Sequence, residues 1–204
     1  MVFVMDASGS IGSTNFDKAI RFVYNVCDAF EIGEEETRVA LVRYSGTAKL
    51  LFTFDAYSSK APLLERIQNI EYTRGGTRTD LALEVAHSDL FGPSSTTKRD
   101  LSMGVSRVLI AMTDGKTNLG VNSVVKPSRV LRKNDSVTIF VMGIGGNVDV
   151  NELNEIATDP DETHVFQLSS FSDLSGFIEH LKDSACYGQW TAVFKVKTLE
   201  LRTL

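Results

Sequence analysis

The stretch that decides the fold is MVFVMDASGSIG, residues 1–12, in which an apolar run stops at Asp6 and gives way to serines and glycines. A continuous apolar run bounded by turn residues is typical of a strand that is buried on both faces. Asp6, Ser8 and Ser10 stand at alternate positions, so the strand ends in one carboxylate and two hydroxyls. A polar turn that caps a helix would give this pattern, and so would a site that holds a ligand.

Strand-like and helix-like segments alternate along the rest of the chain. Two further buried strands are indicated by SRVLIAMTDG (residues 106–115) and SVTIFVMGIG (residues 136–145). The segment STNFDKAIRFVYNVCDAF, residues 13–30, has apolar residues at helical spacing and begins with residues that can cap a helix. Other segments have the same helical character: residues 59–70, 79–91, 121–135, 148–160 and 170–185.

A hairpin interrupts this alternation. The strand-like runs RVALVRYS (residues 38–45) and AKLLFTF (residues 48–54) are separated by a turn too short for a crossover, so they must be antiparallel. Residues 164–168 predict one more short strand. The pattern predicts an α/β fold with a doubly wound, Rossmann-like and mostly parallel sheet, one antiparallel edge strand, and helices on both faces. We expect one domain over residues 1–186, followed by a tail of unknown role, 187–204.

Composition excludes several classes of protein. The 204 residues are 43% hydrophobic and 23% charged, which is ordinary for one folded domain. The formal net charge of −5 argues against a nucleic-acid partner, which requires a basic face. No apolar run approaches the ~20 residues that span a bilayer, so we expect no membrane insertion. No signal peptide is recognisable, and because the chain begins inside an apolar run we expect a domain excised from a longer chain.

The chain has two cysteines, Cys27 and Cys186, and neither belongs to a Cys-x-x-Cys pair. A zinc or redox motif is therefore not indicated. Two readings remain open from the residues alone. Each cysteine is a buried free thiol, or the two form one long-range disulfide in an oxidising compartment.

Three polar segments are expected to meet at one edge of the sheet, because ligands of open α/β sheets bind at the carboxyl ends of the strands. These segments are residues 6–10, the glycine-hinged loop 75–80, and residues 113–115. Together they supply two carboxylates and three hydroxyls: Asp6, Ser8, Ser10, Thr77 and Asp114. These hard oxygen donors without histidine or thiolate favour Mg²⁺ or Mn²⁺ over zinc, and two carboxylates balance the charge of one divalent ion.

Catalytic sites are less well supported. The sequence DGKTN, residues 114–118, lacks the upstream glycine of a phosphate-binding loop. A phosphotransfer nucleophile at Asp6 would need a second acid beside it and a positioned lysine, where Ser8 and Ser10 stand instead. None of the histidines has a catalytic partner visible in the sequence, so we expect structural or surface roles for His87, His164 and His180. We therefore predict that the protein is not an enzyme; a magnesium-dependent phosphotransferase or hydrolase is the remote alternative.

The motifs carry a specific resemblance. DASGS (residues 6–10) resembles the Asp-x-Ser-x-Ser motif of the von Willebrand factor type A domain, with GGTRT (75–79) and MTDG (112–115) at the second and third positions of its metal site. RVALVRYSG, FVMGIG and ELNEIATDPDETHVF are similar to the extracellular branch found in matrilins and in collagen-associated proteins. The resemblance covers about residues 1–185.

This resemblance implies a metal-ion-dependent adhesion site. In such sites, residues matching Asp6, Ser8, Ser10, Thr77 and Asp114 bind the ion directly or through water, and an acidic side chain of the partner completes the coordination. It implies a non-catalytic, Mg²⁺-dependent adhesion module, secreted or on the cell surface, that binds an extracellular protein such as collagen or another acidic matrix protein. The alternative is a structural matrix domain whose main contacts lie away from the metal.

Two further expectations concern the surroundings of this site. Three basic residues flank it and could attract an acidic ligand: Arg74, Arg78 and Lys116. In the fold that the resemblance implies, Cys27 and Cys186 lie on the face opposite the metal, at the ends of neighbouring helices. A disulfide between them is geometrically reasonable there, and it would limit movement of the closing helix.

Overall fold

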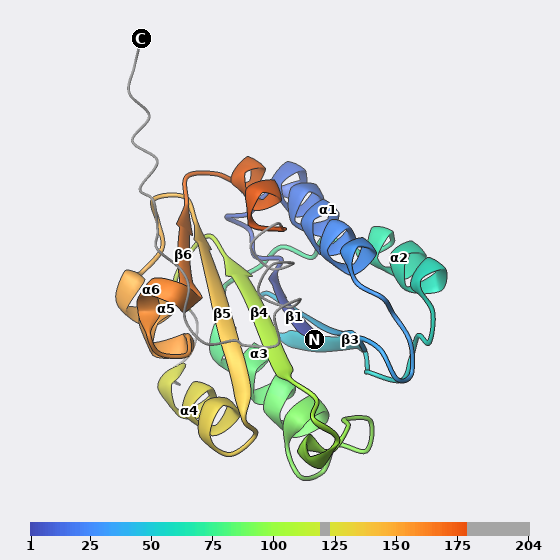
Figure 1. The fold of residues 1–204 in the computed structure, drawn as a ribbon. Coiled ribbons are helices and arrows are strands. Elements are labelled where there is room, and N and C mark those ends of the chain that lie inside the picture. The colour runs from blue at the N-terminus through green and yellow to red at the C-terminus, as the bar shows by residue number, and fades with distance from the viewer. Residues whose placement is uncertain (119–122, 179–204) are drawn as a thin grey trace.

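The computed structural model describes residues 1–118 and 123–178, which form one six-stranded sheet between two layers of helices (Figure 1). The strands are β1 (Val2–Asp6), β2 (Ala40–Tyr44), β3 (Ala48–Phe52), β4 (Arg107–Thr113), β5 (Val137–Ile144) and β6 (Val165–Leu168).

The strand order in the sheet is β3-β2-β1-β4-β5-β6. All neighbouring strands are parallel except β2 and β3, which form the antiparallel hairpin at one edge. The predicted doubly wound sheet with one antiparallel edge strand is confirmed. The two innermost strands, β1 and β4, are the apolar runs that end in Asp6 and, one residue after Thr113, in Asp114.

The helices cover both faces of the sheet, as predicted (Figure 1). One face carries α1 (Ser13–Ala29), α2 (Lys60–Gln68) and the segment that starts with the 3₁₀ turn η3 (Phe171–Asp173). The other face carries α3 (Thr79–Val85), the π-helical turn η1 (Ala86–Phe91), α4 (Val125–Lys133) and α5 (Val150–Ile156). The remaining elements are the 3₁₀ turn η2 (Leu101–Met103) and the short α6 (Asp161–His164).

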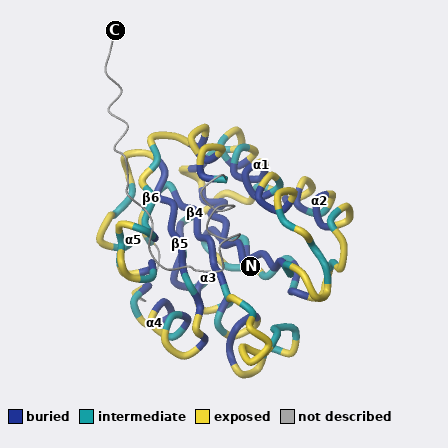
Figure 2. Tube along the Cα trace, viewed as in Figure 1, coloured by how far each residue is buried: buried dark blue, intermediate teal, exposed yellow. Residues whose placement is uncertain are grey.

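The side chains of the central strands alternate between the two layers, because successive residues of a strand point to opposite faces. In β1, Phe3 and Met5 join the cluster under α1 and α2. Val2 and Val4 join the cluster under α3, α4 and α5. All four are 0% exposed, and Figure 2 shows the central strands as the most deeply buried part of the molecule. Neither face of β1 therefore carries polar side chains between Val2 and Met5, as expected for a strand in a sheet covered on both sides.

Three local predictions differ from the structure. Helix α1 has Gly12 at its N-cap and no side-chain cap, because the serines that precede it are directed to the strand-end loop described below. The helix predicted over residues 79–91 changes to π-helical geometry at Ala86. His164 ends α6 instead of starting β6. The predicted closing helix is described only as far as residue 178; its remainder and the tail lie outside the described residues.

Among the described residues, no helix is both long enough and apolar enough to cross a membrane.

Candidate metal centre

The candidate site lies where the chain reverses its direction of travel across the sheet. From β1 the chain moves to β2 on one side and later returns to β4 on the other side, so β1 and β4 are parallel neighbours at a topological switch point. Ligands of doubly wound folds bind outside the carboxyl ends of such strands. Met5 pairs with Met112, so Asp6 and Thr113, the next residues of the two strands, reach this edge together.

Asp6 is held in one orientation by two donors, one in the loop after β1 and one at the end of β4. Its Oδ1 accepts a hydrogen bond from the Ser8 amide at 2.8 Å, and its Oδ2 accepts one from the Thr113 hydroxyl, also at 2.8 Å. Asp6 is 2% exposed. Thr113 was not predicted as a site residue, although its position directly before Asp114 was visible in the sequence.

A line of oxygen atoms leads from this buried carboxylate toward solvent. The hydroxyls of Ser8 and Ser10 lie 3.1 Å apart, and the Ser10 hydroxyl donates to Asp114 Oδ1 at 2.7 Å. Ser8 is buried, Asp114 is half-buried and Ser10 is exposed. The structure thus brings the predicted residues of the first and third loops into direct contact and leaves their outer end accessible.

Thr77 joins the same edge through backbone contacts. The Gly9 amide donates to the Gly75 carbonyl at 2.8 Å, which holds the loop of Thr77 against the first loop. The Thr77 amide donates to Asn118 Oδ1 at 2.9 Å, and the Asn118 amide returns a bond to the Thr77 carbonyl at 3.0 Å. Thr77 is 1% exposed, and within the described residues its hydroxyl has no hydrogen bond to the other four predicted residues.

The backbone geometry of the second loop requires a glycine at position 75. Gly75 has a φ of 111°, in the region that side chains disfavour, and a Cβ on Gly9 would lie 3.4 Å from the Gly75 carbonyl oxygen. A side chain at position 75 would strain the backbone of the loop that carries Thr77, whereas a Cβ at position 9 would make an ordinary contact.

Tyr72 provides a second tie between these loops, and sequence reasoning missed it. Its hydroxyl donates to the Ser8 carbonyl at 2.8 Å and accepts from the Gly12 amide at 3.1 Å. Its ring packs on Phe16 of α1 with centroids 5.3 Å apart. An aromatic residue five positions before Thr77 was the available signal, but only the tertiary structure shows where its hydroxyl points.

The electrostatics of the two carboxylates are unusual. Burial raises the pKa of Asp6 from 3.8 to about 6, although hydrogen bonds from Ser8 and Thr113 oppose that rise. Burial also raises the pKa of Asp114, against the opposing hydrogen bond from Ser10. In the part of the chain that the structure describes, neither carboxylate has a basic side chain within 4.0 Å, since the ion pairs found there are Arg78–Asp80 and His87–Asp135.

The donor set suits a hard divalent cation. No group of three or more acidic, histidine or cysteine side chains able to hold a metal occurs in residues 1–118 and 123–178. An ion at this edge would therefore rely on two carboxylates together with hydroxyls and water. Oxygen-only coordination that retains water is typical of Mg²⁺, so the residues present fit such an ion.

The basic residues around the site differ in availability. Arg78, expected to attract a ligand, forms a two-pronged ion pair with the fully buried Asp80, at 2.8 and 2.7 Å. Arg74 and Lys116 are exposed. Arg74 and Lys116 therefore remain the exposed basic residues close to Thr77 and Asp114 in the sequence.

The histidines in the described part of the chain make structural contacts. His87 Nδ1 lies 2.6 Å from Asp135 Oδ2. His164 stacks on Phe140 with centroids 4.8 Å apart, and its Nδ1 lies 2.8 Å from the Thr163 hydroxyl. His180 lies outside the described residues.

Cys27 is buried in α1, where burial raises the pKa of its thiol to about 12. Cys186 lies outside the described residues, so the disulfide between them stays a prediction.

Comparison with known proteins identifies the class of this domain. The family profile of the von Willebrand factor type A domain matches residues 1–180, and the chain belongs to this family. Its matrix members, in matrilins and collagens, are non-catalytic binding modules, and the chain is of that kind.

The chain is similar to matrilin-1 of Homo sapiens, with 32% identity over 186 residues that cover 91% of this chain and 36% of matrilin-1. It is also similar to the collagen alpha-4(VI) chain of Mus musculus, with 34% identity over 187 residues that cover 91% of this chain and 8% of that one. It therefore spans well under two thirds of the length of either relative.

Among solved structures, proximal thread matrix protein 1 (PTMP1) from the mussel byssus matches with a TM-score of 0.79 and 33% identity, over 91% of this chain and 45% of that one. A further structure of PTMP1, with a zinc occupied MIDAS motif, matches with a TM-score of 0.78 and 33% identity. The metal-ion-dependent adhesion site of that protein thus holds a divalent ion.

Proposed function

We propose that Asp6, Ser8, Ser10, Thr77 and Asp114 hold a divalent cation, Mg²⁺ or Mn²⁺, and that the ion binds an acidic side chain of an extracellular protein. The observation that carries this proposal is Asp6, a buried carboxylate with a raised pKa and no basic partner among the described residues. Burying an unpaired charge is costly, and buried charges are ordinarily paired or coordinate metals. A divalent ion would supply the missing positive charge.

The arrangement favours ligand capture over chemistry on the ligand. Two carboxylates neutralise a divalent ion, and the three hydroxyls add no charge, so the ion keeps affinity for one more anionic oxygen. Ser10 is exposed and Asp114 is half-buried, which makes the outer side of the site reachable for a protein side chain. Arg74 and Lys116 would assist the approach of an acidic ligand.

The choice of Mg²⁺ or Mn²⁺ follows from the donors of this chain. Carboxylate, hydroxyl and water oxygens suit these ions, whereas zinc sites in proteins mostly include histidine or cysteine. The zinc in the PTMP1 structure is compatible with a site that accepts several divalent ions when each is supplied.

The relatives set the context of the proposal. Because matrilin-1 and collagen VI are matrix proteins, we place this domain in the extracellular matrix or on the outer part of a cell-surface protein. Collagen or another acidic matrix protein is the proposed class of ligand. Residues 1–186 are proposed as the functional unit, without a role for residues 187–204.

Chelation tests this function directly. Binding of the domain to immobilised matrix proteins is measured in EDTA and after Mg²⁺ or Mn²⁺ is restored, with Asp114→Ala and Ser8→Ala/Ser10→Ala as variants. Asp55→Ala is the matched control, because exposed Asp55 accepts a hydroxyl bond from Thr53 at 2.6 Å that resembles the Ser10–Asp114 bond. We expect binding to disappear in EDTA and to return when the metal is restored. Binding should be lost in Asp114→Ala and in Ser8→Ala/Ser10→Ala, and it should be kept in Asp55→Ala. Binding that survives EDTA and Asp114→Ala would instead support a structural matrix domain with contacts elsewhere.

A further inference from the structure

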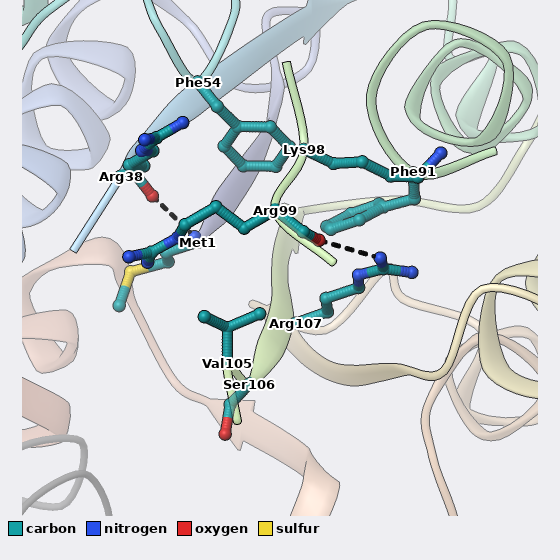
Figure 3. A pocket seen from close by; sticks show the side chains of 9 residues that line it. All are labelled: Met1, Arg38, Phe54, Phe91, Lys98, Arg99, Val105, Ser106 and Arg107. Atoms are coloured by element: carbon teal, nitrogen blue, oxygen red, sulfur yellow. Dashed lines mark hydrogen bonds between the residues drawn. The ribbon is translucent and has the colours of Figure 1, made fainter. Parts of the chain in front are cut away.

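A second charged region lies at the opposite end of the central strands. The basic hollow, as we name it, is a small cavity lined by four basic side chains: Arg38, Lys98, Arg99 and Arg107 (Figure 3). Arg107 is the first residue of β4, and Arg38 lies two residues before β2 begins. The hollow is therefore near the amino ends of these parallel strands, whereas Asp6 and Asp114 lie at their carboxyl ends.

Hydrogen bonds join the chain segments that carry the basic residues of the hollow. The main-chain nitrogen of Met1 donates to the Arg38 carbonyl at 2.7 Å, and Arg107 Nη2 donates to the Arg99 carbonyl at 3.0 Å (Figure 3). Arg107 Nη1 also donates to the Asp135 carbonyl at 2.9 Å. The two bonds of Arg107 hold its guanidinium in place and limit the entropy that would be lost when a ligand orders this side chain.

The positive charges of the hollow meet carbonyls and no carboxylates. Arg99 donates to the carbonyls of Glu35 and Glu36 at 3.0 and 2.7 Å, and the Lys98 ammonium donates to the Gly92 carbonyl. None of the four basic side chains has a carboxylate oxygen within 4.0 Å in the described part of the chain. Nearby Asp100 is exposed, and it uses its carboxylate to accept the Ser102 amide at 2.8 Å. The hollow therefore gathers four basic side chains without a direct ion pair among the described residues, although the charge of Asp100 interacts with Arg107 and Lys98. Hydrogen bonds from Ser102, and then this interaction, lower the pKa of Asp100.

One donor in the hollow is unsatisfied. Arg107 Nε is buried and has no hydrogen-bond partner. A buried donor without a partner costs about 1–3 kcal/mol, and such groups call for an explanation such as an ion that binds there. The rings of Phe54 and Phe91, with centroids 5.5 Å apart, form the apolar side of the hollow. An apolar wall lowers the local dielectric and so strengthens attraction between an anion and the guanidinium groups.

The size of the hollow limits what it can accept. Its volume of about 30 Å³ is small, so only a few atoms of a ligand can enter it. A tetrahedral oxyanion that inserts one or two oxygens from outside fits this space. Guanidinium groups bind such oxyanions through paired, charge-assisted hydrogen bonds.

We propose that the basic hollow binds a tetrahedral oxyanion, presented as a sulfate or phosphate ester on a larger partner. The partner would approach the end of the domain opposite the candidate metal site, so both ends could be occupied at once. This binding does not depend on a divalent ion.

The test is a titration of the ¹⁵N-labelled domain with sodium sulfate and with sodium phosphate, against sodium chloride at equal ionic strength and pH 7. We expect a saturable shift of the Arg107 Nε–Hε resonance with sulfate or phosphate, unchanged by EDTA and by Asp114→Ala. The variants Lys98→Gln and Arg107→Gln should weaken the apparent affinity about tenfold, as for loss of one charge-assisted bond. For Arg107→Gln, whose probe resonance is removed, the backbone amide of Arg99 is followed.

Arg132→Gln is the matched control, since Arg132 also donates to main-chain carbonyls, those of Glu155 and Ala157, away from the hollow. It should leave the affinity unchanged. Lys98→Gln keeps every arginine contact, so it tests the proposal even where Arg107→Gln unfolds the domain. Equal shifts in chloride, or equal affinity in Lys98→Gln, would overturn the proposal.

The carrier is then distinguished with a short sulfated oligosaccharide and a phosphoserine peptide, each compared with its unmodified form. Tighter binding of either modified form, reduced by Lys98→Gln, supports the proposal and names the carrier. If neither modified form binds more tightly than its unmodified form, the hollow holds an adventitious ion only, and the proposal is overturned. Because all arms are repeated in EDTA, this result is independent of whether the metal centre proves correct.

Discussion

Asparagine in place of Asp6 separates the electrostatic cost of the candidate metal site from its binding role. Asp6→Asn preserves the size of the side chain and can preserve both of its contacts. The asparagine carbonyl can still accept from the Ser8 amide, at the position where Asp6 Oδ1 now lies 2.8 Å away. Its amide group can donate to the Thr113 hydroxyl, which in turn can donate to the Gly115 carbonyl at 3.0 Å. The substitution thus removes mainly the charge.

The magnitude follows from the pKa of Asp6, which burial raises from 3.8 to about 6 in the folded protein. Because the folded protein holds this proton more tightly than the unfolded chain, the stability that it contributes is complete below about pH 4. That contribution is lost as pH rises through about 6, and it amounts to about 3 kcal/mol. In EDTA at pH 7.5, Asp6→Asn should therefore be more stable than the wild type by up to about 3 kcal/mol, or about 6–12 °C in melting temperature.

Thermal and urea unfolding in EDTA between pH 4 and 7.5 measure this difference. We expect the advantage of Asp6→Asn to shrink toward pH 4, and we expect added Mg²⁺ to stabilise the wild type only. Asp80→Asn is the matched control, because Asp80 is equally buried but paired with Arg78. It should lose about 1–3 kcal/mol, since it leaves a partly buried arginine unpaired. A variant at position 6 that is less stable than the wild type at pH 7.5 in EDTA would refute the reasoning.

Three further predictions concern the same architecture. Tyr72→Phe should destabilise the domain by about 1–2 kcal/mol and weaken binding of the divalent ion several-fold, because it leaves the Ser8 carbonyl and the Gly12 amide without their shared partner. Urea unfolding measures the loss of stability, and calorimetry with Mn²⁺ measures the loss of metal affinity. The affinity for Mg²⁺ should fall by about tenfold per pH unit below about pH 6, since protons compete for Asp6; Mg²⁺ titrations at several pH values follow this. Gly143→Ala should cost about 1–3 kcal/mol in urea unfolding, because its Cβ would clash with Leu153 Cδ1, and Leu153 is buried in the core with little room to move.

Each of these has a clear contrary result. Tyr24→Phe on α1 serves as the control tyrosine variant, and equal metal affinity in Tyr72→Phe and the wild type would show that the tyrosine does not position the loop. A Mg²⁺ affinity that is constant from pH 7 to pH 5 would mean that Asp6 is not a ligand. If Gly143→Ala is as stable as the wild type, then β5 and α5 do not pack as closely as described.

Much of the fold could be predicted because its signals are local. An apolar run such as residues 2–5 can be buried on both faces only in a covered parallel sheet, and the three-residue turn at Ser45–Thr47 requires an antiparallel hairpin. The N-terminus of α1 was predicted less well. Its cap depends on where the preceding serines point, and the tertiary contact of Ser10 with Asp114 directs them away from the helix.

The sequence by itself determined the chemistry available at the strand ends: two carboxylates and three hydroxyls, at positions that any doubly wound sheet brings to one edge. Only the tertiary structure decided how these groups are held. The contacts of Asp6 with Thr113, of Tyr72 with Ser8, and of Thr77 with Asn118 join residues 41 to 107 positions apart. Sequence periodicity reports burial of a face, but it carries no information on which distant hydroxyl meets a given carboxylate. The basic hollow was invisible for the same reason, since its arginines are scattered along the chain and only the packing of the strand beginnings gathers them.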